Sequence, residues 1–310
     1  MHIVRFVDQY GDVRVGLAEA LQADAGLRVF LDQLKVGSLL RLGIDDLREL
    51  TERTASTPAV SAVGDVQLLP PVDGRTEIWA AGVTYQRSRE ARVQESTEQS
   101  VYEKVYDAQR PELFFKALPW RVVTEGEPIA VRTDSPLNVP EPELALVANR
   151  HAEIVGYLVA NDVSSRSIEG ENPLYLPQAK VYAGSCAISA GIRPAWELPA
   201  VPDLTIRLQI DRAGNCVFDE SITTAAFHRK LPELVDYLFQ CQPFPDGAVL
   251  STGTGIVPPI DFTLTAGDLV RISIEEVGTL RNTVVAGIDA LNWLVDAAAD
   301  PRRRPDIQLS

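Results

Sequence analysis

The sequence predicts a β-rich α+β fold, in which a mixed β-sandwich or roll carries a smaller N-terminal α+β domain. Strands dominate the chain after residue 70, because segment after segment there combines β-branched and aromatic residues between turn residues. Only two helical stretches interrupt them, which argues against a doubly wound sheet. The predicted strands of this region are residues 77–85, 113–117, 143–149, 153–163, 204–211, 247–253, 268–278 and 280–287.

The first 70 residues form the predicted small N-terminal domain. "HIVRFVDQYGDVRVGLA" predicts two strands around a Gly-Asp turn, and "SLLRLGIDDLRELTERT" repeats apolar residues at helical spacing. Prolines and a fresh strand signal in "VQLLPPVDGRTEIWAAGVTY" then place a boundary near residue 70. Residues 71–310 form the predicted main domain.

The two helices predicted in the main domain differ in character. "SREARVQESTEQSVYEKVYDA" is charged and amphipathic, whereas "LPELVDYLFQC" places Leu231, Leu234, Val235 and Leu238 on one stripe. The tail "DPRRRPDIQLS" is predicted to be a solvated end of the chain.

Composition excludes several classes of partner. The net charge of −14 repels phosphate backbones and anionic membranes, so neither nucleic acid nor a membrane is an expected partner. No apolar run reaches the ~20 residues of a membrane span, and the N-terminus lacks the order of a signal peptide. The three cysteines are too widely spaced for a disulfide framework or a CxxC metal site, so a cytoplasmic location is expected.

The stretch "NVPEPELALV" places two carboxylates at the mouth of a buried strand. Glu141 and Glu143 are two residues apart, so in a strand both point to the same face. The following residues predict a β-hairpin that returns through "EIVGYLVANDV". An even loop, for example with Arg150 opposite Glu153, brings Asp162 opposite Glu141, whereas an odd loop or a bulge shifts this register.

Three converging carboxylates with no nearby His or Cys suit a hard divalent cation, with Mg²⁺, Mn²⁺ and Ca²⁺ as the candidates. Three protein ligands leave coordination positions for water and a substrate. The pattern therefore indicates a metal site at Glu141, Glu143 and Asp162, with surface acids of an acidic protein as the alternative.

"EPELALVANRHAEIVGYLVANDVSSRS" resembles the core motif of the fumarylacetoacetate hydrolase superfamily. "WAAGVTY", "PELFFKALPWRVV", "STGTGIVPP" and "AGDLVRISIEEVGTLRNTV" resemble its other blocks, in the same order. The resemblance covers about residues 76–290. It implies the fumarylacetoacetate-hydrolase-type roll, a homodimer or homotetramer, and a divalent metal, usually Mg²⁺, held by the three acids named above.

Two departures from the hydrolase pattern select a branch. Hydrolases carry a water-activating His and Glu after the N-Y motif, but this chain reads "TYQRSREARVQES" there. After the metal Asp it reads "EGENPLYLPQAKVYAGSCAI", which resembles the sugar-acid dehydratases of the superfamily. By that resemblance Glu112 and Lys180 are the catalytic acid and base, in an order that the sequence leaves open.

The implied activity is that of a lyase, a Mg²⁺-dependent dehydratase of a 2-keto-3-deoxy sugar acid. One such reaction of pentose degradation turns 2-keto-3-deoxy-D-arabinonate into 2,5-dioxopentanoate, by enolate formation at the metal and loss of the C4 hydroxyl. A C–C hydrolase of acylpyruvates or diketo acids, and a catalytically silent binding protein of the same fold, are the alternatives.

Six further residues are candidates for binding this small-molecule 2-keto acid. Arg87 and Ser88 could hold its carboxylate or hydroxyls, and Lys116 could neutralise the acids or hold the carboxylate. Thr252, Gly253 and Thr254 belong to a loop whose glycine permits close approach of the backbone to a ligand.

Overall fold

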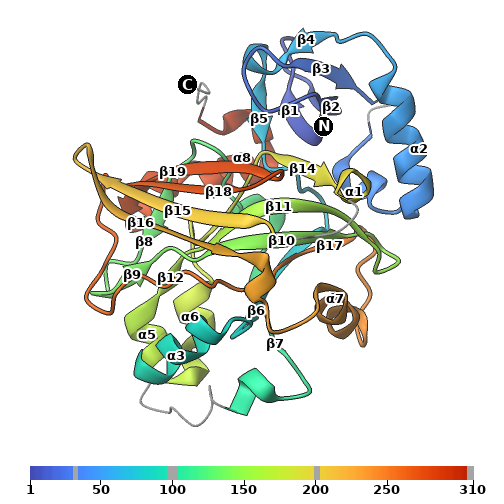
Figure 1. Cartoon of the computed structure of the whole chain (residues 1–310). Coiled ribbons are helices and arrows are strands. Elements are labelled where there is room, and N and C mark those ends of the chain that lie inside the picture. The colour runs from blue at the N-terminus through green and yellow to red at the C-terminus, as the bar shows by residue number, and fades with distance from the viewer. Residues whose placement is uncertain (31–33, 96–103, 199–202, 306–310) are drawn as a thin grey trace.

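The computed structural model describes residues 1–30, 34–95, 104–198 and 203–305 of the chain. Two β-sheets pack face to face, with short helices at one end and the N-terminal strands at the other (Figure 1). The strands are β1 (His2–Val7), β2 (Val13–Ala18), β3 (Gly26–Val29), β4 (Ser61–Ala62), β5 (Gln67–Leu69), β6 (Glu77–Gly82), β7 (Glu112–Ala117), β8 (Ile129–Val131), β9 (Asn138–Val139), β10 (Pro142–Ala148), β11 (Ile154–Asp162), β12 (Ser164–Ser165), β13 (Cys186–Ile188), β14 (Gly191–Pro194), β15 (Thr205–Arg212), β16 (Asn215–Thr223), β17 (Ala248–Ser251), β18 (Leu269–Ile274) and β19 (Gly278–Ala286).

Helices are few and short in the described part of the chain. The α-helices are α1 (Val36–Leu39), α2 (Ile44–Ala55), α3 (Gln86–Glu95), α5 (Arg166–Glu171), α6 (Leu176–Lys180), α7 (Leu231–Phe239) and α8 (Trp293–Ala299). The three segments with helical periodicity overlap α2, α3 and α7. Helix α7 buries Leu234, Val235 and Leu238. Residues 96–103 of the predicted charged helix lie outside the described residues.

The larger sheet runs in the order β4-β3-β2-β1-β14-β11-β10-β17-β6-β7, with β13 paired to β11 and β5 paired to β1. The smaller sheet runs β16-β15-β18-β19-β8, and β9 pairs with β12 separately. The predicted β-rich class is confirmed. Each predicted strand of the main domain overlaps a strand of the structure. Six strands of this region were not predicted: the short strands β8, β9, β12, β13 and β14, and β16, which lies at an edge of the smaller sheet and is mostly exposed.

Strand β10 is buried on both faces, which explains its nearly continuous apolar sequence. Leu144 and Leu146 pack into the core between the two sheets, whereas Ala145 and Val147 pack with α1 and α2 on the opposite face. Because residues alternate along a strand, Glu143 projects from the second of these faces. A carboxylate in such a strand requires a specific compensating partner.

The prediction of a solvated C-terminal tail was wrong for Arg304, and residues 306–310 of that tail lie outside the described residues. The Arg304 guanidinium is buried and donates to Glu127 Oε1 and Oε2 at 2.8 and 2.6 Å and to the Val122 carbonyl at 2.7 Å. Gln67 Nε2 in β5 donates to the Arg304 carbonyl at 3.0 Å. Arg304 therefore ties the end of the chain both to the main sheets and to an N-terminal strand.

His2 makes a second contact between the N-terminal strands and the smaller sheet. Its Nε2 donates to the Val277 carbonyl at 3.0 Å, and burial lowers its pKa to about 4. Because the folded pKa lies below the unfolded value of about 6.5, the neutral imidazole contributes stability above pH 6.5 that is lost as pH falls toward 4.

We expect His2→Gln to flatten this part of the stability–pH profile. Denaturant unfolding should show wild type losing up to about 3 kcal/mol more than the variant between pH 6.5 and pH 4. His151→Gln, at the exposed tip of the β10–β11 hairpin, is the matched control and should leave the profile unchanged. Parallel profiles for wild type and His2→Gln would contradict the role of His2.

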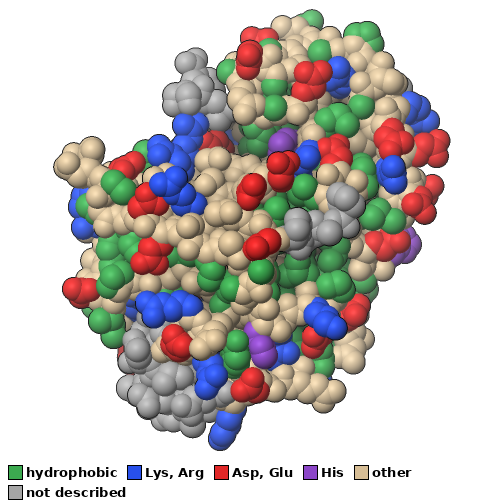
Figure 2. All heavy atoms as spheres, viewed as in Figure 1, with side chains coloured by type: hydrophobic (Ala, Val, Ile, Leu, Met, Phe, Trp, Pro, Cys, Tyr) green, Lys and Arg blue, Asp and Glu red, His purple; other side chains and the backbone are tan. Residues whose placement is uncertain are grey.

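Within the described residues, none of the helices combines the length and the hydrophobicity that a membrane span requires. Acidic and basic side chains are interspersed over the face shown in Figure 2, so that face carries no continuous basic stripe of the kind that binds nucleic acid.

Candidate active site

The β10–β11 hairpin sets the register of the predicted metal ligands. Its loop is odd, because Asn149 rather than Arg150 pairs with Glu153 through a 3.0 Å hydrogen bond from the Asn149 N–H. A bulge then follows, since Ala148 pairs with Ile154 but Val147 pairs with Gly156. The two one-residue offsets cancel. The predicted opposition of Glu141 and Asp162 therefore holds, with the Asp162 N–H donating to the Glu141 carbonyl at 3.0 Å.

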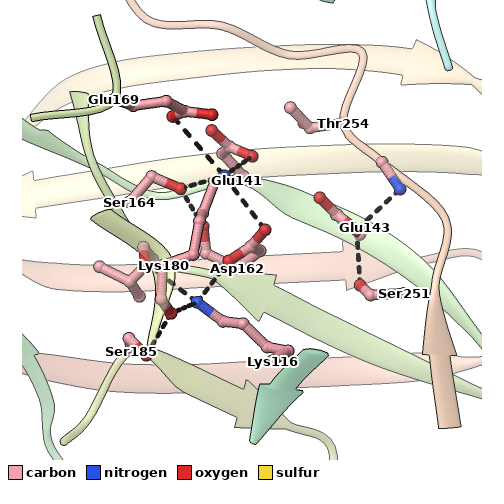
Figure 3. Close-up of polar contacts among 12 residues, drawn as sticks. Lys116, Glu141, Glu143, Asp162, Ser164, Glu169, Lys180, Ser185, Ser251 and Thr254 are labelled. Atoms are coloured by element: carbon pink, nitrogen blue, oxygen red, sulfur yellow. Dashed lines mark hydrogen bonds and ion pairs between the residues drawn. The ribbon is translucent and has the colours of Figure 1, made fainter. Parts of the chain in front are cut away.

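Glu141, Glu143 and Asp162 converge as the register requires. All three are buried, and one carboxylate oxygen from each lies within 4.8 Å of the other two. Figure 3 shows the three side chains directed toward one another from the ends of β10 and β11. This is the arrangement that the sequence predicted.

Glu143 is the most enclosed of the three. Its Oε2 accepts hydrogen bonds from Ser251 Oγ at 2.5 Å and from the Gly253 N–H at 2.8 Å. Burial, and then the negative charges of Asp162 and Glu141, raise the pKa of the Glu143 carboxyl to about 8. Gly253 has φ +89°, and a Cβ there would collide with Thr84, so glycine is needed where the backbone turns its N–H to the carboxylate.

Two lysines lie among the acids. Lys180 Nζ donates to Glu141 Oε2 at 2.8 Å, Asp162 Oδ2 at 3.1 Å and Ser164 Oγ at 2.5 Å. Lys116 Nζ lies 2.5 Å from Asp162 Oδ1. Both lysines are buried, so each ammonium offsets the cost of desolvating a neighbouring carboxylate.

Lys116 reaches this position through a second bulge. In the β6–β7 pair, Ile78 lies opposite Ala117 but Trp79 lies opposite Phe115, so Lys116 is the extra residue. A bulge redirects the side chain of the residue that it inserts. Of the two uses that the sequence suggested for Lys116, its contacts match neutralisation of the acids.

Glu112 projects from the same face as the three acids. Val147 pairs with Val249, and Val249 pairs with Ile78, so these three residues point to one face of the sheet. Residues an even number of positions apart in a strand share a face, so Glu143 in β10 and Gly82 in β6 lie on this same face. Glu112 lies directly opposite Gly82. A Cβ on Gly82 would overlap the Glu112 carboxylate, which therefore lies across the glycine.

The residues predicted to bind substrate differ in where they lie. Ser88 and Thr254 line a small pocket together with Glu141 and Arg166. Arg87, in contrast, is exposed on α3. Thr252 Oγ1 donates to the Leu144 carbonyl at 2.7 Å, and its own carbonyl accepts from Thr84 Oγ1 at 2.6 Å, so it braces the loop beside Glu143.

Two buried charged residues of the site were missed. Glu169 Oε2 lies 3.9 Å from Lys180 Nζ, and Arg166 donates to the Pro259 and Pro258 carbonyls at 2.8 and 3.0 Å. Both belong to α5, which follows directly on the strand that ends near Asp162. Their closeness to Asp162 in the sequence could have indicated that they belong to the site. A charged six-residue segment, however, has the same composition as a solvated turn, and only the tertiary contacts distinguish the two.

The chemistry of these groups fits a hard divalent cation. The donor atoms that converge are all carboxylate oxygens, the donors that Mg²⁺ prefers. Lys180 and Lys116 place positive charge against Glu141 and Asp162 and so offset part of the negative charge of the triad. Glu141, Glu143 and Asp162 are the residues that would hold the ion.

Comparison with known proteins identifies the family. The model of the fumarylacetoacetate (FAA) hydrolase C-terminal family matches residues 77–285. The chain belongs to the fumarylacetoacetate hydrolase family. This assignment confirms the family resemblance seen in the sequence. The residues of the candidate active site described above all lie within residues 77–285.

Within the family, two relatives with named activities are similar over most of this chain. A probable 2-keto-3-deoxyxylonate dehydratase of Haloferax volcanii is 48% identical over 263 residues, 84% of this chain and 90% of that protein. A 2-dehydro-3-deoxy-D-arabinonate dehydratase of Saccharolobus solfataricus is 45% identical over 226 residues, 72% of this chain and 76% of that protein.

A solved structure extends the similarity to the fold. It is 2-keto-3-deoxy-D-arabinonate dehydratase complexed with magnesium and 2,5-dioxopentanoate, at 35% identity and a TM-score of 0.77. The alignment covers 93% of this chain and 99% of that one. The similarity thus extends to a structure that contains both magnesium and 2,5-dioxopentanoate.

Proposed function

We propose that this chain is a Mg²⁺-dependent dehydratase of a 2-keto-3-deoxy sugar acid, such as 2-keto-3-deoxy-D-arabinonate, with 2,5-dioxopentanoate and water as products. The observation that carries the proposal is the buried triad Glu141, Glu143 and Asp162 with Lys180 bonded into it. The similarity to two dehydratases of this substrate class supports it.

The triad would hold Mg²⁺, which when bound supplies Lewis-acid stabilisation of negative charge at the keto oxygen of the substrate. Mn²⁺ and Ca²⁺ are alternatives with the same preference for oxygen ligands. The chain's own contribution to this step is to keep the carboxylates dehydrated and aligned, through the Glu143 bonds from Ser251 and Gly253.

Glu112 and Lys180 share the proton transfers. One removes the proton at C3, and the other gives a proton to the C4 hydroxyl as the C4–O bond breaks and water leaves. The resulting C3=C4 enone still carries the C5 hydroxyl. Loss of one proton from C5 and one from its hydroxyl, with uptake of one proton each at C3 and C4, turns C5 into the aldehyde of 2,5-dioxopentanoate. Each transfer by a positioned group typically contributes roughly 10²–10⁴-fold to the rate.

The positions of the histidines favour dehydration over C–C hydrolysis. The chain has three histidines, and none contacts the triad or Lys180: His2 bonds to Val277, His151 is exposed at a hairpin tip, and His228 stacks on Tyr106. A water-activating histidine of the hydrolase kind is thus missing from the described site.

The direct test is turnover by purified protein with Mg²⁺ and 2-keto-3-deoxy-D-arabinonate. Release of 2,5-dioxopentanoate is followed by coupling to an aldehyde dehydrogenase, and an acylpyruvate is assayed in parallel. If no 2-keto-3-deoxy pentonate or hexonate yields product, the proposal fails. Cleavage of the acylpyruvate instead would identify a hydrolase.

Removal of the metal should abolish turnover. Excess chelator is expected to stop product release, and added Mg²⁺ should restore it, because the keto oxygen then has only hydrogen bonds to stabilise its developing charge. A titration with Mg²⁺, Mn²⁺ and Ca²⁺ measures which ion supports the rate. Activity that persists in excess chelator would rule out the role of the triad.

Gly82→Ala is expected to lower kcat by at least tenfold with little change in Mg²⁺ affinity. The new methyl group would displace the Glu112 carboxylate, and a misplacement of about 1 Å can cost 10²-fold. Gly43→Ala is the control for adding a methyl group, because Gly43 has φ −65° and a Cβ there would meet no atom nearer than 3.9 Å. An unchanged kcat in Gly82→Ala would mean that Glu112 has no catalytic role or tolerates the shift.

Three further expectations stay predictions. The family resemblance implies a homodimer or homotetramer, which light scattering on the purified protein would test. A cytoplasmic location follows only from composition. A domain division near residue 70 would require residues 71–310 to fold alone, although β1 pairs with β14 of the main domain.

A further inference from the structure

A cavity lies where the N-terminal strands meet the smaller sheet (Figure 1). Its volume of about 450 Å³ falls within the roughly 300–1,000 Å³ that ligand pockets usually have. Residues 20–23 and Leu68 of β5 line it from the N-terminal part of the chain, and β18 and β19 line it from the smaller sheet. None of the residues of the candidate active site described above belongs to this lining.

Two arginines lie side by side in the part of the lining that the smaller sheet supplies. Arg271 in β18 is directly opposite Arg281 in β19, and directly opposed side chains point to the same face. Both guanidinium groups carry a positive charge at neutral pH, and both residues are half-buried. Like charges in this relation destabilise a strand pair unless negative charge lies nearby.

Glu125 is the one acid among the described residues that line the cavity, and it is bonded to Arg281. Its Oε1 accepts a hydrogen bond from Arg281 Nε at 2.6 Å, and its Oε2 accepts from the Arg281 N–H at 2.7 Å. Burial raises the pKa of the Glu125 carboxyl, and the hydrogen bonds and charge of Arg281 oppose that rise more strongly than the charge of Arg271 does. The negative charge of Glu125 therefore acts mainly on Arg281.

Arg271 is the second positive charge of the cavity. Within the described part of the chain, its guanidinium has no hydrogen bond or ion pair. His2, which also lines the cavity, adds no positive charge near neutral pH, because burial lowers its pKa to about 4. The lining further includes Leu21, Leu68 and Ala190, so the cavity combines one cationic group with apolar walls.

We propose that this cavity binds a small organic anion, whose carboxylate or phosphate-ester headgroup pairs with Arg271 and whose apolar body contacts Leu21 and Leu68. A guanidinium presents parallel N–H donors that match either headgroup, and burial of the apolar body adds to the affinity. The ligand differs in class from a 2-keto-3-deoxy sugar acid, which has no apolar body. Because it binds only the folded chain, it also raises the stability of the fold.

Octanoate is the first probe, titrated calorimetrically into the purified protein at pH 7. We expect one octanoate per chain, a denaturation midpoint that rises with octanoate concentration, and at least tenfold weaker binding of neutral 1-octanol. Octyl phosphate tests the other headgroup, and tighter binding of it than of octanoate would identify a phosphate ester as the preferred ligand.

Arg271→Met removes the charge and should weaken octanoate binding at least tenfold. The loss of one of two opposed like charges should not lower the denaturation midpoint without octanoate, so weaker binding is separable from a failure to fold. Arg53→Met, which removes an exposed arginine from α2, is the matched control and should bind octanoate within twofold of wild type.

Lys180→Met distinguishes this cavity from the candidate active site and should also bind octanoate within twofold of wild type. Wild-type octanoate affinity in Arg271→Met would overturn the inference, as would a loss of binding confined to Lys180→Met. Equal affinities for octanoate and 1-octanol, or no binding of either anionic probe, would overturn it as well. These measurements do not use dehydratase turnover, so failure of the proposed function would leave their outcome unaffected.

Discussion

Lys180→Met is expected to lose dehydratase turnover by roughly 10²–10⁴-fold, the usual contribution of a positioned acid or base, while it still binds Mg²⁺. The side chain that disappears is the buried ammonium bonded to Glu141 and Asp162. Its loss frees two oxygens of the triad, so Mg²⁺ affinity should be unchanged or higher. Coupled product release and calorimetry measure the two effects separately.

The matched control for this change is Lys230→Met, because Lys230 is an exposed lysine at the start of α7. It should leave both turnover and Mg²⁺ affinity as in wild type. Turnover retained in Lys180→Met would show that Lys180 only balances charge, and Glu112 would then have to act with another group.

Arg304→Ala is expected to destabilise the fold by about 3–5 kcal/mol, the range seen when one partner of a buried ion pair is removed. The change strands Glu127, which is 3% exposed and whose pKa is raised by burial and held down by Arg304. Denaturant unfolding measures the loss of free energy. The pH should be kept near 7, where the unpaired carboxyl costs most.

Arg303→Ala tests whether the effect belongs to the buried pair. Arg303 is the neighbouring residue, its side chain is 63% exposed, and its contact with Asp296 is 4.0 Å long. An exposed pair of this kind contributes little, so the free energy of unfolding should change by less than about 1 kcal/mol. Equal losses in the two variants would refute the importance of burial at Arg304.

The strands and the triad were predictable because they depend on short-range patterns. Apolar runs rich in β-branched residues on either side of a polar break locate β10 and β11, and the alternation of side chains along a strand places Glu141 and Glu143 on one face. The register that brings Asp162 to them was predicted from an even loop, and it is correct for a different reason. The odd loop and the bulge each shift it by one residue in opposite senses.

Other features could not be predicted because long-range contacts decide them. Arg304 occurs in a charged tail, and only its contact with Glu127, far away in the sequence, makes it part of the core. Glu169 occurs in a short polar helix of which only Arg166 and Glu169 are buried, and its carboxylate lies 3.9 Å from Lys180 Nζ. Local composition cannot distinguish such residues from solvated ones, since the partner that stabilises the charge is distant along the chain.

The buried pairing of β10 with β11 separates the position of the triad from the length of the hairpin loop. Residues 142–147 pair with residues 156–161, and both strands are buried, so a slip of one residue would turn their side chains to the opposite faces. Deletion of one of residues 150–152, in contrast, leaves the same pairs closed by a two-residue loop, a common hairpin length. Such a loop variant should therefore keep the Mg²⁺ affinity of wild type, whereas deletion of one residue within 156–161 should abolish Mg²⁺ binding.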